Sequence, residues 1–442
     1  MRTCASLLAL LALPGSGRGA DRQQPPNVLF ILTDDQRFDA LGAYGNRVVR
    51  TPNLDRLAAQ GARLDAFYVA SPLCNPSRAS FLTGLYPHQH GVLGGAKDRR
   101  PQSPEDIPAG SATVATLLNR VGYRTGFIGK AHLAGDPRRW GFTETPVFLS
   151  EGASEHVDPQ LNVGGAIRKV RGQITQIFAD AAISFVRHKT DKPWFLWFST
   201  TAPHEPYFDP THSYRASQIT PPPGWPPGQP LESPQTWAEY YATISMLDDQ
   251  IGRVLAEIDR LGMAERTVVI FASDNGFMFG SHGQAKKQVW FEESVRTPAI
   301  VRWPGHIQPG TVVVDPVVSV DLLPTLLDLS GSSPIAALEG TSMLPALQAR
   351  PSLRKVAYSE VQQGKHWGGD YWQMVRDSRF KLVRFKDGRE YFYDLSVDPW
   401  ERADPMGVRG QRAAKDHLRR ALDEWLLRTP QPRVRAPGKR VP

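Results

Sequence analysis

The sequence predicts an α/β protein: a large, doubly wound sheet, mixed but mostly parallel, followed by a smaller C-terminal α+β subdomain with an antiparallel sheet. Strand-like and helix-like segments alternate through the first three quarters of the 442 residues, which is typical of a doubly wound sheet. The first strand, Asn27–Thr33, is an almost continuous apolar run, as expected for a central parallel strand covered on both faces. After about residue 335 the alternation stops, and short strand-like segments follow one another.

The elements of the large sheet follow from apolar spacing and from capping residues. Thr51 is placed to cap a helix that Gly61 ends. Apolar residues at helical spacing predict a helix from Ile174 to Phe185 and a long amphipathic helix from Tyr240 to Leu261. The proline-rich segment 218–234 is predicted to be a surface loop or lid. The remaining elements are a helix at Ser111–Val121 and strands at Tyr123–Ile128, Trp194–Ser199, Arg266–Ala272 and Thr297–Arg302.

The C-terminal part has the pattern of short antiparallel strands followed by a helix. The predicted elements are strands at Tyr371–Val375, Phe380–Arg384 and Tyr391–Leu395, a turn at Lys386–Gly388, and a helix at Gln411–Leu427. The chain is therefore divided into a signal peptide at 1–20, the large α/β domain at 21–335, the α+β subdomain at 336–428, and a tail at 429–442. The tail is basic, and we expect it to be disordered.

Residues 1–20 have the pattern of a signal peptide, so we expect an exported protein, periplasmic or secreted. Arg2 precedes the apolar run Leu7–Leu13, and small residues lead to Ala20. The run is too short to span a bilayer, and Cys4 precedes it where a lipoprotein cysteine would follow. No stable membrane anchor is therefore expected. Cleavage near Ala20 leaves Cys74 as the single thiol, which excludes an intrachain disulfide.

The charge balance does not indicate a nucleic-acid partner. The 52 Lys and Arg residues against 44 Asp and Glu residues give a formal net charge of +8, and much of this excess follows Glu401. We interpret this basic segment as a solvated tail rather than as a binding surface for anionic glycans or a membrane. No nucleic-acid-binding motif is present, so no nucleic-acid partner is expected.

Polar and ionisable side chains follow four of the predicted strands at the same end. They are Asp34 and Asp35 after the first strand, Lys130 and His132 after Tyr123–Ile128, His204 after Trp194–Ser199, and Asp274 and Asn275 after Arg266–Ala272. Ligands of open α/β sheets bind outside the carboxyl ends of the strands, so we expect these residues to form one site. Lys130 and His132 are two positions apart and would face the same way in an extended segment.

Four of these residues offer only oxygen as a metal donor: Asp34, Asp35, Asp274 and Asn275. Such a set suits a hard divalent cation and neither zinc nor copper. Adjacent aspartates in a regular strand point to opposite faces, so Asp34 and Asp35 can bind one ion only where the strand has ended. Their position just before Gln36 indicates that it has.

A short motif carries the most specific functional signal. Cys74-Asn75-Pro76-Ser77-Arg78 runs into a small and apolar segment that ends with Thr83-Gly84. The motif resembles the signature of the type I, formylglycine-dependent sulfatase family, which belongs to the alkaline-phosphatase-like superfamily. The stretch from Tyr393 to Glu401 also resembles the C-terminal subdomain of that family, so the resemblance covers almost the whole mature chain.

The resemblance implies an alkaline-phosphatase-like fold and a sulfuric ester hydrolase of the arylsulfatase type. It implies that a formylglycine-generating or equivalent maturation enzyme oxidises Cys74, on the unfolded chain, to the aldehyde formylglycine. It also implies one Ca²⁺ ion per chain, held by Asp34, Asp35, Asp274, Asn275 and the matured Cys74 side chain. One hydroxyl of the hydrated aldehyde would attack sulfur, and the other would expel the sulfate.

The same resemblance assigns roles to the basic residues. Arg78 and Lys130 would hold and polarise the formylglycine, and His132 would be the base for the expulsion. His204 and Lys287 would bind the sulfate and protonate the departing alcohol. Lys287 is chosen over Lys286 because family members place this lysine five positions after a His-Gly pair, here His282-Gly283. The aromatic-Glu-Glu-Ser run that should follow is Phe291–Ser294, and Lys286 is expected in solvent.

Three alternatives stay open at the level of sequence: a phosphonate or phosphate ester hydrolase on the same scaffold, a non-catalytic binder of sulfated glycans, and a chain whose Cys74 stays a thiol. For a sulfatase, the expected substrate is a sulfated small molecule or glycan. Carbohydrate sulfate esters are favoured by analogy, and aryl or alkyl sulfates are the alternative. The rim of the pocket is predicted at Tyr207, Phe208, segment 218–234 and Gln362–Trp372, with His366, Trp367 and Asp370.

Overall fold

The computed structural model describes residues 24–94, 106–222, 225, 231, 233–332, 338–362, 371–403 and 411–430. Some predictions concern residues outside these ranges. They are the signal peptide at 1–20 with Cys4, positions 223–224, 226–230 and 232 of the proline-rich segment, residues 363–370 with His366, Trp367 and Asp370, and residues 431–442 of the tail.

The large sheet has ten strands in the order β11-β2-β10-β9-β1-β8-β4-β5-β6-β7. The central strands β9, β1, β8, β4 and β5 are parallel, and antiparallel strands lie on both sides of them. This confirms the predicted mixed, mostly parallel sheet. The strands are β1 (Asn27–Thr33), β2 (Ala62–Leu64), β4 (Arg124–Lys130), β5 (Val147–Leu149), β6 (Gln160–Val163), β7 (Ala166–Lys169), β8 (Trp194–Ser199), β9 (Thr267–Ser273), β10 (Ala299–Arg302) and β11 (Thr311–Val313).

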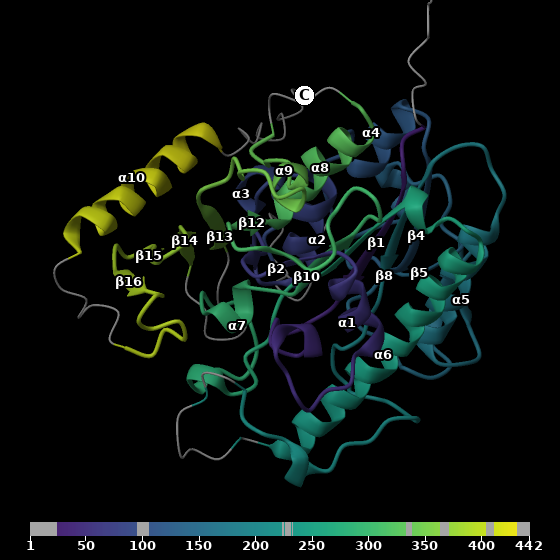
Figure 1. The fold of residues 1–442 in the computed structure, drawn as a ribbon, viewed down its shortest axis with the longest axis horizontal. Helices are drawn as coiled ribbons and strands as arrows, with labels where there is room; N and C mark the ends of the chain where they lie inside the picture. The colour runs from purple at the N-terminus through teal and green to yellow at the C-terminus, as the bar shows by residue number, and fades with distance from the viewer. Residues whose placement is uncertain are drawn as a thin grey trace, which may run out of the picture.

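Helices cover both faces of this sheet, as a doubly wound fold requires. Phe30 of β1 packs in the core with α2 (Cys74–Thr83), α4 (Val114–Arg120), α8 (Leu322–Leu329) and α9 (Leu344–Leu347). Its neighbour Ile31 points to the other face, where α1 (Pro52–Ala59), α5 (Ile174–Arg187) and α6 (Pro234–Arg260) pack. Figure 1 shows α5 and α6 on one side and α2, α4 and α8 on the other. Within the described ranges, no helix is both long and apolar enough to cross a membrane.

The central parallel strands end in register. Thr33 of β1 pairs with Ser273 of β9, and Leu32 of β1 pairs with Ser199 of β8. Gly129 of β4 also pairs with Ser199. The residues that follow these strands therefore leave the sheet at one edge, which is what allows them to form a single site.

Element boundaries differ from the prediction where local signals compete. β4 continues to Lys130, because Lys130 pairs with Leu149 of β5. α4 begins after Thr113 rather than at Ser111, because the Thr113 hydroxyl accepts a hydrogen bond from the Thr116 amide. α6 begins at Pro234, a residue favoured in the first turn of a helix, so the last residue of the predicted proline-rich loop is helical. Strands of two to four residues, such as β5 and the pair β3 (Phe67–Tyr68) and β12 (Val317–Val318), were too short to show alternation in the sequence.

The C-terminal subdomain is a four-stranded antiparallel sheet with one helix, which confirms the second predicted sheet. Its strands are β13 (Ala357–Val361), β14 (Trp372–Arg376), β15 (Phe380–Phe385) and β16 (Glu390–Asp394), and its helix is α10 (Arg412–Arg428). β13 was not predicted. Leu418, Leu422 and Trp425 of α10 are buried in the core of this subdomain. Figure 1 shows the subdomain at one end of the molecule.

A buried ionic group connects the C-terminal sheet to the short helix α7 (Glu292–Val295). Lys381 of β15 donates to Glu292 Oε1 at 3.1 Å and pairs with Glu401 Oε1 at 2.7 Å, and Glu292 lies in α7. Tyr68 of β3 donates its hydroxyl to Glu292 Oε2 at 2.8 Å. The Glu292 amide donates to Glu401 Oε2 at 2.8 Å. We call Glu292, Lys381 and Glu401 the interface cluster.

Candidate active site

The predicted strand-end residues meet at the carboxyl edge of the large sheet. They lie after or at the end of β1 (Asp34, Asp35), β4 (Lys130, His132), β8 (His204) and β9 (Asp274, Asn275). Cys74 and Arg78 from the first turns of α2 and Lys287 from the segment before α7 join them. Lys130 is the last residue of β4 rather than a residue beyond it.

The strand β1 ends at Thr33, as the paired aspartates predicted. The backbone of Asp35 is left-handed, with a φ of 57°, so the two carboxylates no longer alternate as they would in a strand. The Asp35 amide donates to Asp274 Oδ1 at 3.3 Å, and the Tyr240 hydroxyl donates to the Asp35 carbonyl at 2.9 Å. These contacts hold Asp34 and Asp35 on the same side of the sheet edge.

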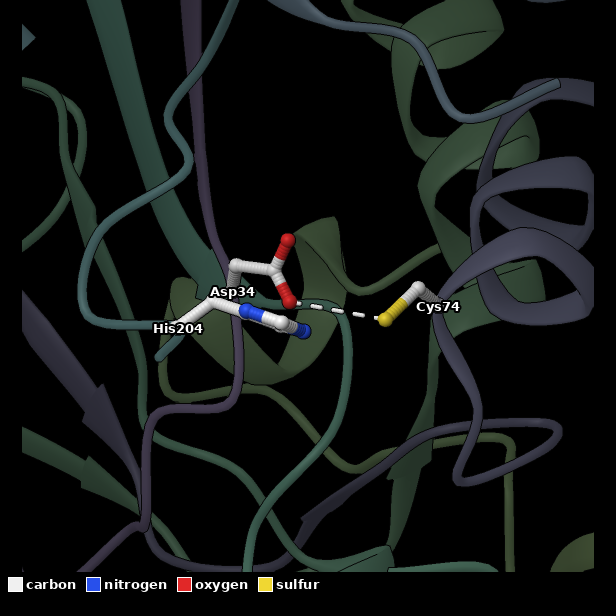
Figure 2. A group of neighbouring side chains, drawn as sticks. All are labelled: Asp34, Cys74 and His204. Atoms are coloured by element: carbon white, nitrogen blue, oxygen red, sulfur yellow. Dashed lines mark hydrogen bonds between the residues drawn. The ribbon is translucent and has the colours of Figure 1, made fainter. Parts of the chain in front are cut away.

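Cys74 is the first residue of α2 and is buried. Its Sγ lies 3.4 Å from Asp34 Oδ1, and Lys287 donates to the same sulfur at 2.9 Å. Figure 2 shows Cys74 facing Asp34, with the ring of His204 beside the same carboxylate. Burial first, and then the negative charge of Asp34, raise the pKa of the Cys74 thiol to about 12. The side chain is therefore a protonated thiol at neutral pH, which is a poor nucleophile.

Arg78 lies one helical turn after Cys74 and connects the ends of all four central strands. Its Nε donates to Asp274 Oδ2 at 2.7 Å, and its Nη2 donates to Asp34 Oδ2 at 3.2 Å. Its Nη1 donates to the Lys130 carbonyl at 2.9 Å and to Ser199 Oγ at 2.5 Å. The four hydrogen bonds of this one buried guanidinium therefore fix the ends of β1, β4, β8 and β9 relative to α2.

The acidic residues converge in a way that fits a cation. Oxygen atoms of Asp34, Asp35 and Asp274 and the Cys74 sulfur all lie within 4.8 Å of one another, and all four residues are buried. Asn275 Oδ1 is buried and has no hydrogen-bond partner among the described residues, while its Nδ2 lies 2.5 Å from Asp35 Oδ1. Rotating the amide by half a turn brings Oδ1 to the carboxylate side. Four oxygen-bearing side chains around one point suit a hard divalent ion.

The carboxyl groups of the site differ in their ionisation. Burial alone would raise the pKa of Asp34, but Lys130, His204, Arg78 and Lys287 outweigh it and hold that pKa well below its usual range. Burial, and then the neighbouring charge of Asp34, raise the pKa of Asp274 to about 6. The negative charge of Asp34 thus adds to the effect of burial at Asp274, and a bound cation would lessen the repulsion between the two carboxylates.

His132 lies beside the cationic residues of the site. Its backbone φ is 49°, so the segment after β4 is not extended, and the expected shared direction of Lys130 and His132 does not apply. Burial first, then the positive charges of Lys130 and Arg78, lower the pKa of His132 well below its usual value. Its Nδ1 is buried with no hydrogen-bond partner in the part of the chain that the structure describes. The imidazole is therefore neutral and able to accept a proton.

His204 has a defined tautomer. Its Nδ1 lies 2.6 Å from the Glu205 carbonyl, and because a carbonyl only accepts, Nδ1 carries a proton. Nε2 lies 3.7 Å from Asp35 Oδ2 and is the nitrogen that faces the site. Its side chain is 21% exposed, so it lies at the mouth of the site rather than deep within it.

Of the two adjacent lysines, Lys287 reaches the site. It is buried and pairs with Asp35, whose carboxylate, against the effect of burial, holds the pKa of Lys287 well above its usual value. Lys286 was expected in solvent, but it forms an ion pair with Glu205, and its side chain is only 27% exposed. Lys286 and Glu205 are 81 positions apart, and no local sequence pattern links them, so the sequence could not reveal this ion pair.

Two further side chains of the site were missed. Ser199 is the last residue of β8 and accepts a hydrogen bond from Arg78, and the strand-end rule could have found it. Glu205 follows His204 and contacts Lys286, and no pattern marked it. At the predicted rim, Tyr207 packs on Tyr240 and Phe279, with ring centroids 5.6 Å and 5.9 Å apart, so the described contacts of this ring are local packing.

Known proteins are similar to this chain in sequence and in structure. Residues 26–332 match the family model described as Sulfatase, and residues 280–427 match that of N-sulphoglucosamine sulphohydrolase, C-terminal. An N-acetylglucosamine-6-O-sulfatase of Bacteroides thetaiotaomicron is 26% identical over 90% of this chain and 86% of that protein. The N-acetylgalactosamine-6-sulfatase of Rattus norvegicus is 32% identical over 77% of this chain and 68% of that protein. A solved structure in complex with its substrate D-glucosamine-2-N,6-O-disulfate has a TM-score of 0.79 and 25% identity, covering 92% of this chain and 98% of that one.

Proposed function

The chain belongs to the sulfatase family, and we propose that it hydrolyses sulfate monoesters of carbohydrates with a formylglycine made from Cys74 and one bound Ca²⁺ ion. The position of Cys74 carries this proposal. Its sulfur lies 3.4 Å from Asp34 Oδ1, within a cluster of oxygen donors, and its pKa of about 12 makes a thiolate mechanism unfavourable. An oxygen-bearing side chain facing a cation suits the same position.

The ligands proposed for the ion are Asp34, Asp35, Asp274 and Asn275, with residue 74 as a further one. When bound, the cation and the formylglycine supply an activated hydroxyl and a positive charge beside the sulfate. The choice of calcium rests on the donor set, which contains only hard oxygen ligands and three carboxylates.

The basic residues balance the charges of the acids, because Arg78, Lys130 and Lys287 are all paired with aspartates of the site. Arg78 and Lys130 are paired with Asp34 and Asp274 and are proposed to hold residue 74 and the acids in place. Lys287, which reaches Cys74 Sγ, is proposed to bind a sulfate oxygen. Positive groups fixed in advance toward a developing charge typically contribute about 3–4 kcal/mol each to the transition state.

Two histidines are proposed to move protons. His204 donates its Nδ1 proton in a hydrogen bond to the Glu205 carbonyl, so Nε2 faces the site, and in the imidazolium form of the ring the Nε2 proton is the one proposed to pass to the departing alcohol oxygen. His132 is neutral because its pKa is lowered, and it is proposed to accept the proton that is released when sulfate leaves. The two rings thus have opposite tasks, which their different environments support.

The substrate class follows from the relatives. The proteins from Bacteroides thetaiotaomicron and Rattus norvegicus are named for 6-sulfated N-acetylhexosamines, and the solved structure binds a 6-O-sulfated glucosamine. We therefore propose 6-O-sulfated amino sugars as the first substrates. The protein is also proposed to be exported, and to require a formylglycine-generating or equivalent enzyme as its maturation partner.

The test is release of inorganic sulfate from a panel of esters. The panel contains 6-O-sulfated N-acetylglucosamine and N-acetylgalactosamine, a sulfated polysaccharide, an aryl sulfate, and phosphate and phosphonate esters of the same alcohols. We expect the highest kcat/KM for a carbohydrate sulfate. A large preference for the phosphonate or phosphate ester, or cleavage of the aryl sulfate alone, contradicts the proposal.

Mass spectrometry of the peptide that contains residue 74 accompanies this assay. An aldehyde at residue 74 supports the mechanism, whereas full activity with an unmodified thiol contradicts it. A matured chain that binds sulfated glycans but releases no sulfate would instead be the non-catalytic binder.

A further inference from the structure

The loop between β5 and β6, residues 150–159, lies against the site although no sequence pattern pointed to it. β5 pairs with the end of β4, with Gly129 opposite Phe148 and Lys130 opposite Leu149. The loop therefore leaves the sheet beside Lys130, at the edge where the site residues gather. Gly152 and His156 are the two residues of the loop that approach the site.

Gly152 lies directly against the imidazole of His132. A Cβ atom on Gly152 would lie 2.6 Å from Nε2, 2.7 Å from Cε1 and 3.1 Å from Cδ2 of that ring. Non-bonded carbon and nitrogen atoms do not approach to 2.6 Å, so a side chain at this position requires the ring or the loop to move. The His132 ring thus occupies space that is open only because residue 152 has no side chain.

Both ends of the segment that holds Gly152 are fixed. On one side, the Ala131 amide donates to the Leu149 carbonyl at 2.8 Å. On the other side, the Ile174 amide donates to the His156 carbonyl at 2.9 Å. The His156 side chain is buried, and after burial itself the charge of His204 lowers its pKa, so this end also lies beside the site. Because these hydrogen bonds hold the loop, a side chain at residue 152 would displace the His132 ring rather than the loop.

The His132 ring has no hydrogen bond at Nδ1 to fix its orientation, as far as the described residues extend. A catalytic histidine is usually oriented through the nitrogen that does not react. Here the van der Waals contact between the His132 ring and Gly152 orients the ring instead of such a hydrogen bond. Packing against the bare backbone, rather than a hydrogen-bonded carboxylate, limits how the ring can rotate and shift.

We propose that Gly152 is a positioning residue for His132, holding the imidazole where it can accept a proton. This inference rests on the proposed function, since proton transfer by His132 is part of it. A shift of about 1 Å in a reacting group can cost on the order of 100-fold in rate. The separation of Cβ and Nε2 in a Gly152→Ala variant demands a shift of nearly that size.

The experiment compares Gly152→Ala, His132→Ala and the double variant on one carbohydrate sulfate. We expect Gly152→Ala to lower kcat by about 10- to 100-fold with KM changed by at most about twofold. The double variant should be no slower than His132→Ala alone, because the ring that Gly152 positions is already absent. Unchanged kcat in Gly152→Ala, or losses that multiply in the double variant, would overturn the inference.

Gly252→Ala is the matched control. A Cβ on Gly252 would lie 2.4 Å from Asn53 Cγ, an equal crowding at the contact of α6 with α1, away from His132. This variant should keep the parental kcat. Crystal structures of both variants give a readout that does not depend on activity: the His132 ring should move in Gly152→Ala only. An unmoved ring contradicts the inference, whereas a parent enzyme that cleaves no sulfate ester contradicts the proposed function instead.

Discussion

The active site and the interface cluster are both buried groups of acids and bases, yet their acids are arranged differently. In the interface cluster, Lys381 meets one carboxylate oxygen of Glu292 and one of Glu401, and the Tyr68 hydroxyl and a backbone amide meet the other two. In the active site, oxygens of three aspartates point to one place, within 4.8 Å of one another and of the Cys74 sulfur.

This difference separates a structural ion cluster from a binding site. The acids of the interface cluster each meet donors of the protein, whereas the convergent acids crowd their oxygens together; burial first, and then the charge of Asp34, raise the pKa of Asp274 to about 6. Burial and charge are common to both groups. Convergence of the oxygen atoms is what distinguishes the candidate metal site.

The sharpest test of this comparison removes Cys74. Cys74→Ala should lower kcat/KM for sulfate esters by at least about 1000-fold, because the proposed nucleophile is lost. The thermal unfolding midpoint should fall by only about 2–4 °C, since one buried sulfur contributes little to the fold. Wild-type protein made without a maturation enzyme is the control and should be equally inactive. Activity retained in Cys74→Ala contradicts the proposed site.

Lys381→Met should have the opposite signature. It leaves Glu292 and Glu401 without their shared buried cation, so the free energy of unfolding should fall by about 3–5 kcal/mol. The kcat of the folded enzyme should be unchanged. Lys386→Met, in the exposed turn between β15 and β16, is the matched control and should change stability by no more than about 0.5 kcal/mol. A fall in kcat at unchanged stability would show that the two clusters are not independent.

Removal of calcium should affect only the active site. Dialysis against a chelator should abolish sulfate release and lower the free energy of unfolding, by about 2.7 kcal/mol when calcium had been present at 100 times its Kd. Calcium should restore both. In Asp274→Asn, which removes one converging carboxylate, this calcium-dependent stabilisation should be reduced, while in Lys381→Met it should persist. A thermal unfolding midpoint that is the same with and without calcium argues against a cation site.

The smallest expected effect is the pH dependence of the interface cluster. Burial raises the pKa of Glu401 from 4.5 to about 7. The folded chain therefore keeps a proton that the unfolded chain loses near pH 4.5, and stability should fall as pH rises from 4.5 to 7, by about 1–3 kcal/mol. Glu401→Gln should remove this slope, measured as the difference in unfolding free energy between variant and parent. An equal slope in both proteins would contradict the assignment.

The sequence predicted which side chains would meet at the candidate active site because parallel strands bring their ends together. Asp34, Asp274 and Lys130 needed only the positions of their strands to be placed near one another. The interface cluster could not be predicted in this way: Glu292, Lys381 and Glu401 come from a short helix, a strand of the C-terminal sheet and a loop, and no periodicity links them. Gly152 was missed for a similar reason, since its importance depends on one distance to His132.

The helix α2 has a consequence for biosynthesis. All of its residues, from Cys74 to Thr83, are buried, and Cys74 is 2% exposed. Under the proposed mechanism, the enzyme that converts residue 74 could not reach it in the native state and would have to act before the nascent polypeptide folds. The fraction of active protein in each preparation would then be determined before the hydrophobic core forms. Adding the maturation enzyme to finished, thiol-bearing protein should not rescue it.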